Sequence, residues 1–285
     1  MARFFMKIKP LPIQMALMFI FLPFLSSCTN FFFQPLHPHV ASPEQYEIKY
    51  EDIYFNGDSG KLHGWWFPAK PSASQPVKAT VLFLHGNGQN ISTHSGLIYW
   101  LTQYQYDVFI FDYRGYGKSE GSAQLEGALN DISRAREYVA SRIKNSNKLF
   151  VVGHSLGASL GVVNLAMNAG VVDGIILVSP FSEYRKITRE TMSRSWLTWA
   201  FQWPISLTIN DDYNPIDYVT QLPDVPKLFM YSEEDTVIKP EHVLRLYNRA
   251  NAPKSIERSW GNHNSLFAQK ENQQIILRYL NEWSM

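Results

Sequence analysis

One stretch constrains this chain more than any other: the apolar run Leu149–Val152 leads directly into Gly153-His154-Ser155-Leu156-Gly157. The run has the composition of a buried strand, and the residues from Ala158 to Met167 have that of a helix. G-x-S-x-G between a strand and a helix forces the serine into a sharp, strained turn. The two glycines have no side chain, which leaves room for the neighbouring elements to pack against the turn. We therefore expect the Ser155 hydroxyl at the end of a strand, beside a helix N-terminus that favours developing negative charge.

Most of the other strand-like segments are also short apolar runs separated by helix-length stretches. Such runs suit strands buried on both faces of a parallel sheet, whereas Tyr46–Phe55 and Lys61–Phe67 suit an antiparallel hairpin. Alternation of strands and helices implies an α/β domain with helices on both faces of the sheet. With Leu149–Val152 the segments predict eight strands, mostly parallel, in one domain over residues 46–285; the others are Thr80–Leu84, Asp107–Phe111, Gly174–Val178, Lys227–Tyr231 and Ser255–Ser259.

The segment 181–222 interrupts this alternation. It is too long for an ordinary crossover loop and contains Trp196, Trp199, Phe201 and Trp203. We interpret it as an insertion over the strand ends, a candidate lid. The alternative is a crossover helix whose tryptophans pack in the core.

Composition excludes several classes of protein. With 45% hydrophobic residues and a net charge of +1, the chain is neither disordered nor equipped with the basic face that nucleic acid requires. Its single cysteine, Cys28, excludes an intramolecular disulfide and a cysteine-cluster metal site. The histidines follow no H-E-x-x-H or comparable ligand spacing. We therefore expect neither a metal nor a cofactor.

The N-terminal residues have the pattern of a targeting segment. Three basic residues within the first nine precede the apolar run Leu11–Leu25, which is shorter than the ~20 residues of a membrane-spanning helix, so residues 1–27 are predicted to be a signal peptide. Leu25-Ser26-Ser27-Cys28 resembles the lipobox of bacterial lipoproteins. The resemblance implies that Cys28 is lipidated and tethers the domain to a membrane through residues 28–45. Thr29 after the cysteine favours the periplasmic face of the outer membrane. The alternatives are a simple secretory signal and an uncleaved anchor.

Two further motifs accompany the glycine-flanked serine. His85-Gly86-Asn87-Gly88 follows the predicted strand Thr80–Leu84, and residues 111–119 have the pattern D-x-R-G-x-G-x-S from Asp112 onward. With these motifs, the chain resembles the α/β-hydrolase superfamily over Tyr46–Trp283. The resemblance implies the α/β-hydrolase fold with a short helical lid, and an oxyanion hole formed by the backbone N–H groups of Asn87 and Leu156.

The resemblance also implies an acid and a histidine at set places in the chain. Asp235 follows the predicted strand Lys227–Tyr231, and His263 lies in the loop after the last strand. The chain order Ser155, Asp235, His263 is that of this superfamily. His263 would act as the general base for Ser155, and Asp235 would orient the imidazole. Glu234 is the nearest alternative for the acid.

A serine nucleophile implies acyl transfer. The chain resembles small bacterial lipoprotein hydrolases related to monoglyceride lipases and depalmitoylases. This predicts a serine hydrolase for carboxylic esters or thioesters with lipid-like or short acyl groups, held at a membrane through Cys28. The alternatives are a serine aminopeptidase and a non-catalytic envelope binding protein on a hydrolase scaffold.

Overall fold

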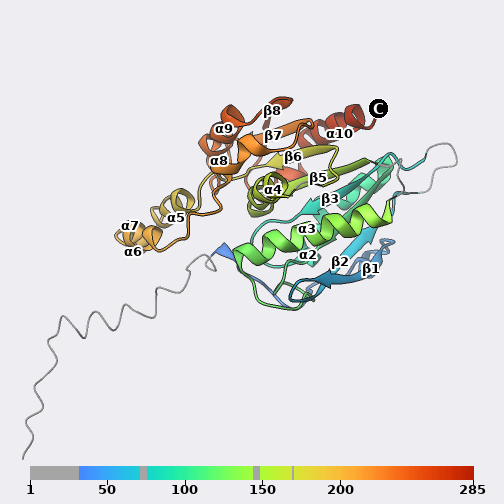
Figure 1. Cartoon of the computed structure of the whole chain (residues 1–285), viewed down its shortest axis with the longest axis horizontal. Coiled ribbons are helices and arrows are strands. Elements are labelled where there is room, and N and C mark those ends of the chain that lie inside the picture. Colours follow the sequence, from blue (N-terminus) through green and yellow to red (C-terminus); the bar gives the residue numbers. More distant parts are fainter. Residues whose placement is uncertain (1–31, 71–75, 144–147, 169) are drawn as a thin grey trace, which may run out of the picture.

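The fold is built on one eight-stranded sheet (Figure 1). The computed structural model describes residues 32–70, 76–143, 148–168 and 170–285. The strand order is β1-β2-β4-β3-β5-β6-β7-β8, in which β2 runs antiparallel to both of its neighbours and all the other pairs are parallel. The strands are β1 (Glu51–Gly57), β2 (Gly60–Phe67), β3 (Ala79–Leu84), β4 (Tyr106–Phe111), β5 (Lys148–His154), β6 (Gly174–Val178), β7 (Lys227–Ser232) and β8 (Lys254–Ser259). The predicted α/β-hydrolase fold with a mostly parallel eight-stranded sheet is confirmed.

Helices cover both faces of the sheet. α3 (Leu125–Arg142), α4 (Leu156–Met167), α8 (Pro215–Tyr218) and α9 (Pro240–Arg249) pack in one core cluster, and α2 (Ile91–His94) with α10 (Lys270–Ser284) packs in the other. Short 3-10 turns complete the chain: η3 (Pro43–Tyr46), η4 (Ser95–Leu97), η5 (Tyr99–Tyr104), η6 (Val219–Gln221) and η7 (Leu266–Ala268).

The central strands divide their side chains between these two cores. In β3, Leu82 and Leu84 join the α3/α4 core, whereas Val81 and Phe83 join the α2/α10 core. Successive strand residues point to opposite faces, so a strand buried on both faces must be apolar at every position. All six residues of β3 are buried, and this explains the uninterrupted apolar run in the sequence.

The predicted first strand began too early. The structure places β1 at Glu51, because Pro43 begins the 3-10 turn η3 and Ser42 caps it. Proline fits the first position of such a turn, where its missing N–H is not needed. The hairpin partner β2 pairs with β1 in antiparallel register from Gly57↔Gly60 to Glu51↔Trp66.

Between β6 and β7 the chain makes a helical excursion that stands away from the sheet (Figure 1). It contains α5 (Tyr184–Met192), α6 (Trp196–Trp199) and α7 (Gln202–Leu207). The tryptophans of α6 and α7 are exposed, Trp196 to 85%. The interpretation of these side chains as core residues of a crossover helix is therefore wrong.

Residues 32–46, which we call the N-terminal strap, lie against the domain. Phe33 is buried, with its ring edge-on to Tyr116, and the backbone of Pro35 bridges to Gln89. The strap is mostly extended, as its prolines indicate, but it is bound along the domain rather than hanging from it. The predicted signal peptide and Cys28 lie outside the described residues. Within the described ranges, no helix is both long and apolar enough to cross a membrane.

Candidate active site

Ser155 lies at a strained turn between β5 and α4. Its φ of 53° and ψ of −119° place a side-chain-bearing residue in a region that L-residues rarely adopt. Glycine allows the turn: a Cβ on Gly157 would lie 2.2 Å from the carbonyl oxygen of Leu84, and one on Gly153 would lie 2.6 Å from the Cα of Ala158. The predicted strand, sharp turn and helix are therefore present, and Ser155 sits at the carboxyl end of β5.

The three predicted catalytic side chains converge. His263 Nε2 lies 3.0 Å from the Ser155 Oγ, and His263 Nδ1 lies 2.7 Å from Asp235 Oδ2. Because an ionised carboxylate can only accept, Nδ1–H donates to Asp235, and Nε2 is left to accept from the serine hydroxyl. Ser155 and His263 each retain 8% exposure, so they are shielded but not sealed from solvent.

Of the two candidates for the acid, Asp235 and not Glu234 is hydrogen-bonded to His263. Asp235 is 3% exposed and accepts hydrogen bonds from the backbone N–H groups of Val237 and Ile238 at 2.8 Å each. Burial alone would raise the pKa of Asp235, but the hydrogen bond from His263 and that from Ile238 outweigh it and lower the pKa. Asp235 therefore stays ionised opposite the imidazole. Glu234 is exposed, and its backbone N–H donates to Ser232.

The H-G-N-G loop follows β3 and lies against the nucleophile. A Cβ on Gly86 would be 3.6 Å from that of Ser155. His85 of this loop is fully buried, and burial lowers its pKa to about 3, so it is neutral and packs its ring on Tyr113. Leu156 is the first residue of α4, where backbone N–H groups lack an intrahelical acceptor. The loop and the helix start thus lie on either side of Ser155.

The N-terminal strap is hydrogen-bonded to the H-G-N-G loop and its neighbours, which the sequence did not indicate. The backbone N–H of Gln34 donates to Asn87 Oδ1 at 3.0 Å, and that of Leu36 donates to the Gln89 carbonyl at 3.0 Å. The Leu36 carbonyl in turn accepts from Asn90 Nδ2 at 2.8 Å. The strap contributes backbone groups to all three hydrogen bonds, and any residue except proline carries both such groups. The side chains of the strap therefore did not predict these contacts.

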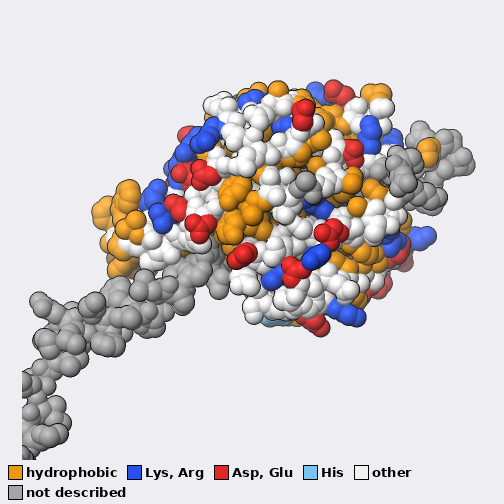
Figure 2. Space-filling model, viewed as in Figure 1, with side chains coloured by type: hydrophobic (Ala, Val, Ile, Leu, Met, Phe, Trp, Pro, Cys, Tyr) orange, Lys and Arg blue, Asp and Glu red, His pale blue; other side chains and the backbone are white. Residues whose placement is uncertain are grey.

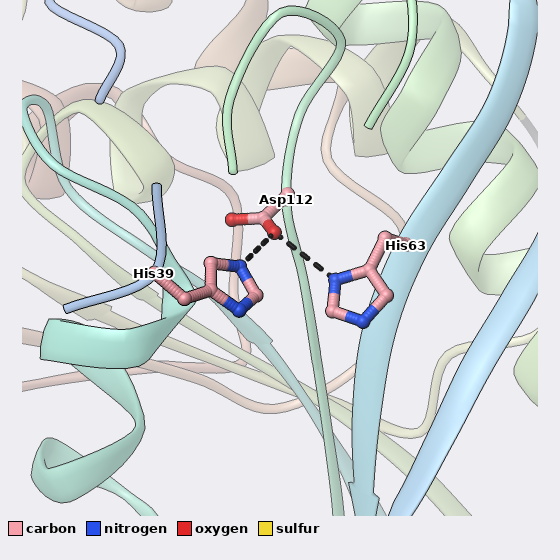
Figure 3. A group of neighbouring side chains, drawn as sticks. All are labelled: His39, His63 and Asp112. Atoms are coloured by element: carbon pink, nitrogen blue, oxygen red, sulfur yellow. Dashed lines mark hydrogen bonds and ion pairs between the residues drawn. The ribbon is translucent and has the colours of Figure 1, made fainter. Parts of the chain in front are cut away.

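Asp112 joins the strap to the sheet (Figure 3). His39 of the strap donates to Asp112 Oδ2 at 2.9 Å, and His63 of β2 lies 3.2 Å from the same oxygen. Burial would raise the pKa of Asp112, but the hydrogen bonds from His39, His63 and the Ile91 N–H hold this pKa well below its usual range. Asp112 is therefore buried and ionised, and its carboxylate connects three segments of the chain: the strap, β2 and the start of α2.

His39, His63 and Asp112 are also the residues that could hold a metal, because their ligand atoms lie within 4.8 Å of one another. Hydrogen bonding accounts for the same geometry. The other ring nitrogen of His63 lies 2.7 Å from Asp52 Oδ1, so each nitrogen of this ring faces a carboxylate oxygen. Asp112 Oδ1 already accepts the Ile91 N–H at 2.9 Å. Each of these atoms therefore has a hydrogen-bond partner among the described residues.

His154, beside the nucleophile, takes no part in the hydrogen-bonded triad. Its ring is buried 4.9 Å from that of His263, and neither of its ring nitrogens has a hydrogen-bond partner. Burial and the nearby His263 lower its pKa well below the ordinary value. It is a neutral packing neighbour, as expected of a residue that points away from the turn.

Comparison with known proteins places this architecture among hydrolases. Residues 75–218, just over half of the chain, match the family model described as serine aminopeptidase, S33. The protein YfhR of Salmonella typhi is 33% identical over 72% of this chain and 70% of its own. The lysophosphatidylserine lipase ABHD12 of Danio rerio is 31% identical over 67% of this chain and 51% of its own. The Pyrococcus furiosus esterase Pf2001 is 20% identical, covers 89% of this chain and 99% of its own, and superimposes with a TM-score of 0.73.

The family match and the side-chain geometry support different residues of the candidate site. The matched residues include Ser155 and the H-G-N-G loop but end before Asp235 and His263. Those two residues are assigned by chain order and by their distances from one another and from Ser155.

We expect Gly157→Ala to destabilise the fold, because its Cβ would enter the backbone of β3 at Leu84. The free energy of unfolding, measured by urea denaturation, should fall by about 3 kcal/mol or more. Gly161→Ala on the same helix is the control. Its Cβ would meet only the flexible Leu84 side chain, at 3.1 Å, so the change should stay within about 1 kcal/mol. Equal effects of the two substitutions would contradict the steric argument.

We expect His39→Ala to lower the free energy of unfolding by about 1 to 3 kcal/mol at neutral pH, because it removes a donor from the buried Asp112. His37→Ala, two residues earlier and exposed, should change it by less than about 0.5 kcal/mol. The pKa of Asp112 is lowered in the folded state, so its contribution is present above the ordinary aspartate pKa and declines as the pH falls below that value. Urea denaturation from pH 7 to pH 3 measures both effects; indistinguishable His39 and His37 variants would refute the strap contact.

Proposed function

This chain belongs to the serine aminopeptidase S33 family of α/β-hydrolases, and on that premise we propose that it is a serine hydrolase that cleaves carboxylic esters or thioesters through an acyl-enzyme intermediate. The observation that carries the proposal is the continuous hydrogen-bonded line from Ser155 through His263 to Asp235. Such a line has the geometry that activates an alcohol as a nucleophile.

The chemistry follows from the positions of these groups. As Ser155 Oγ attacks the acyl carbon, its proton passes to His263 Nε2, 3.0 Å away. Asp235 stabilises the resulting imidazolium without taking the proton, and its lowered pKa suits that role. His263 then protonates the leaving alcohol or thiol. Water attacks the acyl-enzyme with His263 again as the base, and release of the acid restores the serine.

The developing oxyanion needs donors on the side facing the acyl carbonyl. We assign this role to the backbone N–H groups of Leu156, at the start of α4, and Asn87, in the H-G-N-G loop. Loss of a single donor in such a site costs about 10²- to 10³-fold in turnover. The strap hydrogen bonds to Asn87 and Gln89 would hold this loop in place during the reaction.

The proposed substrate class is supported by the names of two similar proteins and by the exposed aromatic side chains of the helical excursion. ABHD12 of Danio rerio is named as a lipase and Pf2001 as an esterase, which supports an ester substrate. The exposed aromatic side chains of α6 and α7 would suit a lid for substrates with acyl chains. The family's description as serine aminopeptidase favours peptides as a second candidate, since the same triad attacks an amide.

We also propose that the protein is a lipoprotein of the cell envelope, tethered through Cys28 to the periplasmic face of the outer membrane after removal of residues 1–27. The support is the lipobox-like Leu25-Ser26-Ser27-Cys28, in which the chain's single cysteine stands at the modified position.

A fluorophosphonate probe should label the purified protein at Ser155, and Ser155→Ala should abolish labelling and lower kcat by roughly 10⁶-fold. Ser159→Ala is a matched control, because Ser159 is a buried helix serine whose Oγ bonds to backbone carbonyls. Turnover of p-nitrophenyl esters, an acyl thioester series and aminoacyl p-nitroanilides would then rank the substrate classes.

The outcomes separate the candidate functions. Turnover of esters or thioesters that increases with acyl length would support the lipid-like substrates. Turnover of anilides alone would favour the aminopeptidase. Absence of both labelling and turnover would leave a binding protein on a hydrolase scaffold.

Cys28→Ala should release the protein from the membrane fraction into the soluble fraction of the envelope, because no acyl chain could then be attached. Fractionation followed by immunoblotting measures this, and a shift in mass of the wild type by a diacylglyceryl group would identify the modification. Unchanged membrane retention of the variant would contradict the lipid anchor and favour an uncleaved apolar segment.

A further inference from the structure

The helical excursion carries an apolar surface that takes no part in the proposed bond cleavage. Its large side chains face solvent over one short stretch of chain. Trp196 is 85% exposed, Leu207 66% and Leu197 63%. Figure 2 shows hydrophobic side chains gathered at the end of the projection. We call this set the apolar tip; it consists of Trp196, Leu197, Trp199, Phe201, Trp203, Ile205 and Leu207.

The apolar tip is built on a folded base. Ile187, Met192 and Ile209 are buried beneath it, and the Arg189 guanidinium lies 4.8 Å from the centre of the Trp203 ring. The excursion therefore has an inner apolar side that is buried and an outer apolar side whose seven large side chains are 38% to 85% exposed. Soluble monomers rarely expose a continuous apolar patch of this kind unless it binds something.

The position of the first described residues, at the base of the excursion, indicates which partner covers the apolar tip. The ring of Phe32, the first described residue, lies 5.0 Å from that of Tyr184, where α5 begins, and 6.2 Å from that of Phe181. The 31 residues before it include the apolar run Leu11–Leu25 and the lipobox-like Cys28. The part of the chain best suited to a membrane therefore joins the domain at the base of the excursion.

Composition points to the same occupant. Trp, Leu and Phe are the residues that insert at the boundary between lipid headgroups and acyl chains. Residues 184–207 hold four basic side chains and one acidic side chain, Glu190. Arg185 is ion-paired with Asp211 and Lys186 with Glu190, which leaves Arg189 and Arg194 without a carboxylate partner among the described residues. Basic side chains flanking an apolar surface complement anionic headgroups.

We propose that the apolar tip is a membrane-docking surface that inserts into the interfacial region of an anionic lipid bilayer. The proposed lipid on Cys28 and the apolar tip would then form two contacts with one bilayer, and the domain would be held with the excursion toward the lipid. Arg194 donates to the carbonyl of Val237, whose backbone N–H donates to Asp235, so the excursion contacts the loop that holds Asp235. This goes beyond the proposed hydrolysis and does not depend on it.

The test uses the full chain reconstituted in vesicles of phosphatidylcholine and phosphatidylglycerol, with or without brominated acyl chains. Bromine quenches tryptophan emission only at contact, and three of the eight tryptophans are in the tip. We expect brominated lipid to lower the emission of the wild type. Leu197→Asp with Leu207→Asp keeps every tryptophan but adds charges that anionic lipid repels, so this variant should lose the quenching.

Met167→Asp with Val171→Asp is the matched control. Both residues are exposed, and α4 runs from Ser155 away from the active-site edge to Met167, so they lie at the other end of the sheet. This variant should be quenched like the wild type. The thermal unfolding temperature of each variant shows that it is folded, and Trp196→Ser, at the most exposed position, should reduce quenching with the least disturbance to packing.

Two results would overturn the proposal. One is equal quenching in the wild type and the Leu197/Leu207 variant, which would place other tryptophans in the lipid. The other is a wild-type dimer by light scattering that the same variant dissociates, with no quenching by brominated lipid, which would assign the tip to a second copy of the chain. Neither readout involves catalysis, so failure here is distinct from failure of the proposed hydrolase function.

Discussion

The close approach of α4 to β3 is the constraint on which the site depends. Gly157 lies where a Cβ would be 2.2 Å from the Leu84 carbonyl, and this packing fixes Ser155 at a φ of 53°. The strain is local and is held by the buried central strands, of which β3 is buried at all six positions. The Ser155 hydroxyl thereby projects from the end of β5 toward His263, and the helix N-terminus lies behind it. Loops at the same edge of the sheet bring His263 and Asp235 to that point.

The loops at this edge are stabilised from outside by the N-terminal strap. Asp112 follows β4 directly, and its carboxylate accepts from His39 of the strap and from the Ile91 N–H of α2. Removing one donor from a buried carboxylate is costly, so Asp112 couples the strap to α2, which begins shortly after the H-G-N-G loop. The segment that leads to the proposed membrane anchor is thereby part of the structure around the candidate active site. The proposed anchor and the proposed catalytic groups are therefore connected through one set of contacts.

Much of this could be predicted from residue patterns, for identifiable reasons. Buried strands such as β3 and β5 are apolar at every position, so their runs are visible in the sequence. The acid was less certain, because Asp235 and Glu234 are adjacent and chemically alike; only the side-chain directions, one toward His263 and one toward solvent, separate them. The strap contacts could not be predicted, since the strap contributes mainly backbone groups to them, which its sequence does not distinguish. The exposure of Trp196 could not be predicted either, because aromatic residues occur both in protein cores and at interfaces.

The sequence by itself determined most of the strands and the strained serine turn, because uninterrupted apolar runs and local sterics encode them, and the resemblance to α/β-hydrolases implied the chain order of Ser155, Asp235 and His263. Only the tertiary structure decided that His263 lies beside Ser155, 108 positions away in the chain, and beside Asp235, 28 positions away. It also decided that His39 and His63 share Asp112 and that the tryptophans of the excursion face outward. The reason is physical: distances between side chains distant along the chain, and the face that a short helix buries, depend on how whole elements pack and not on the residues beside them.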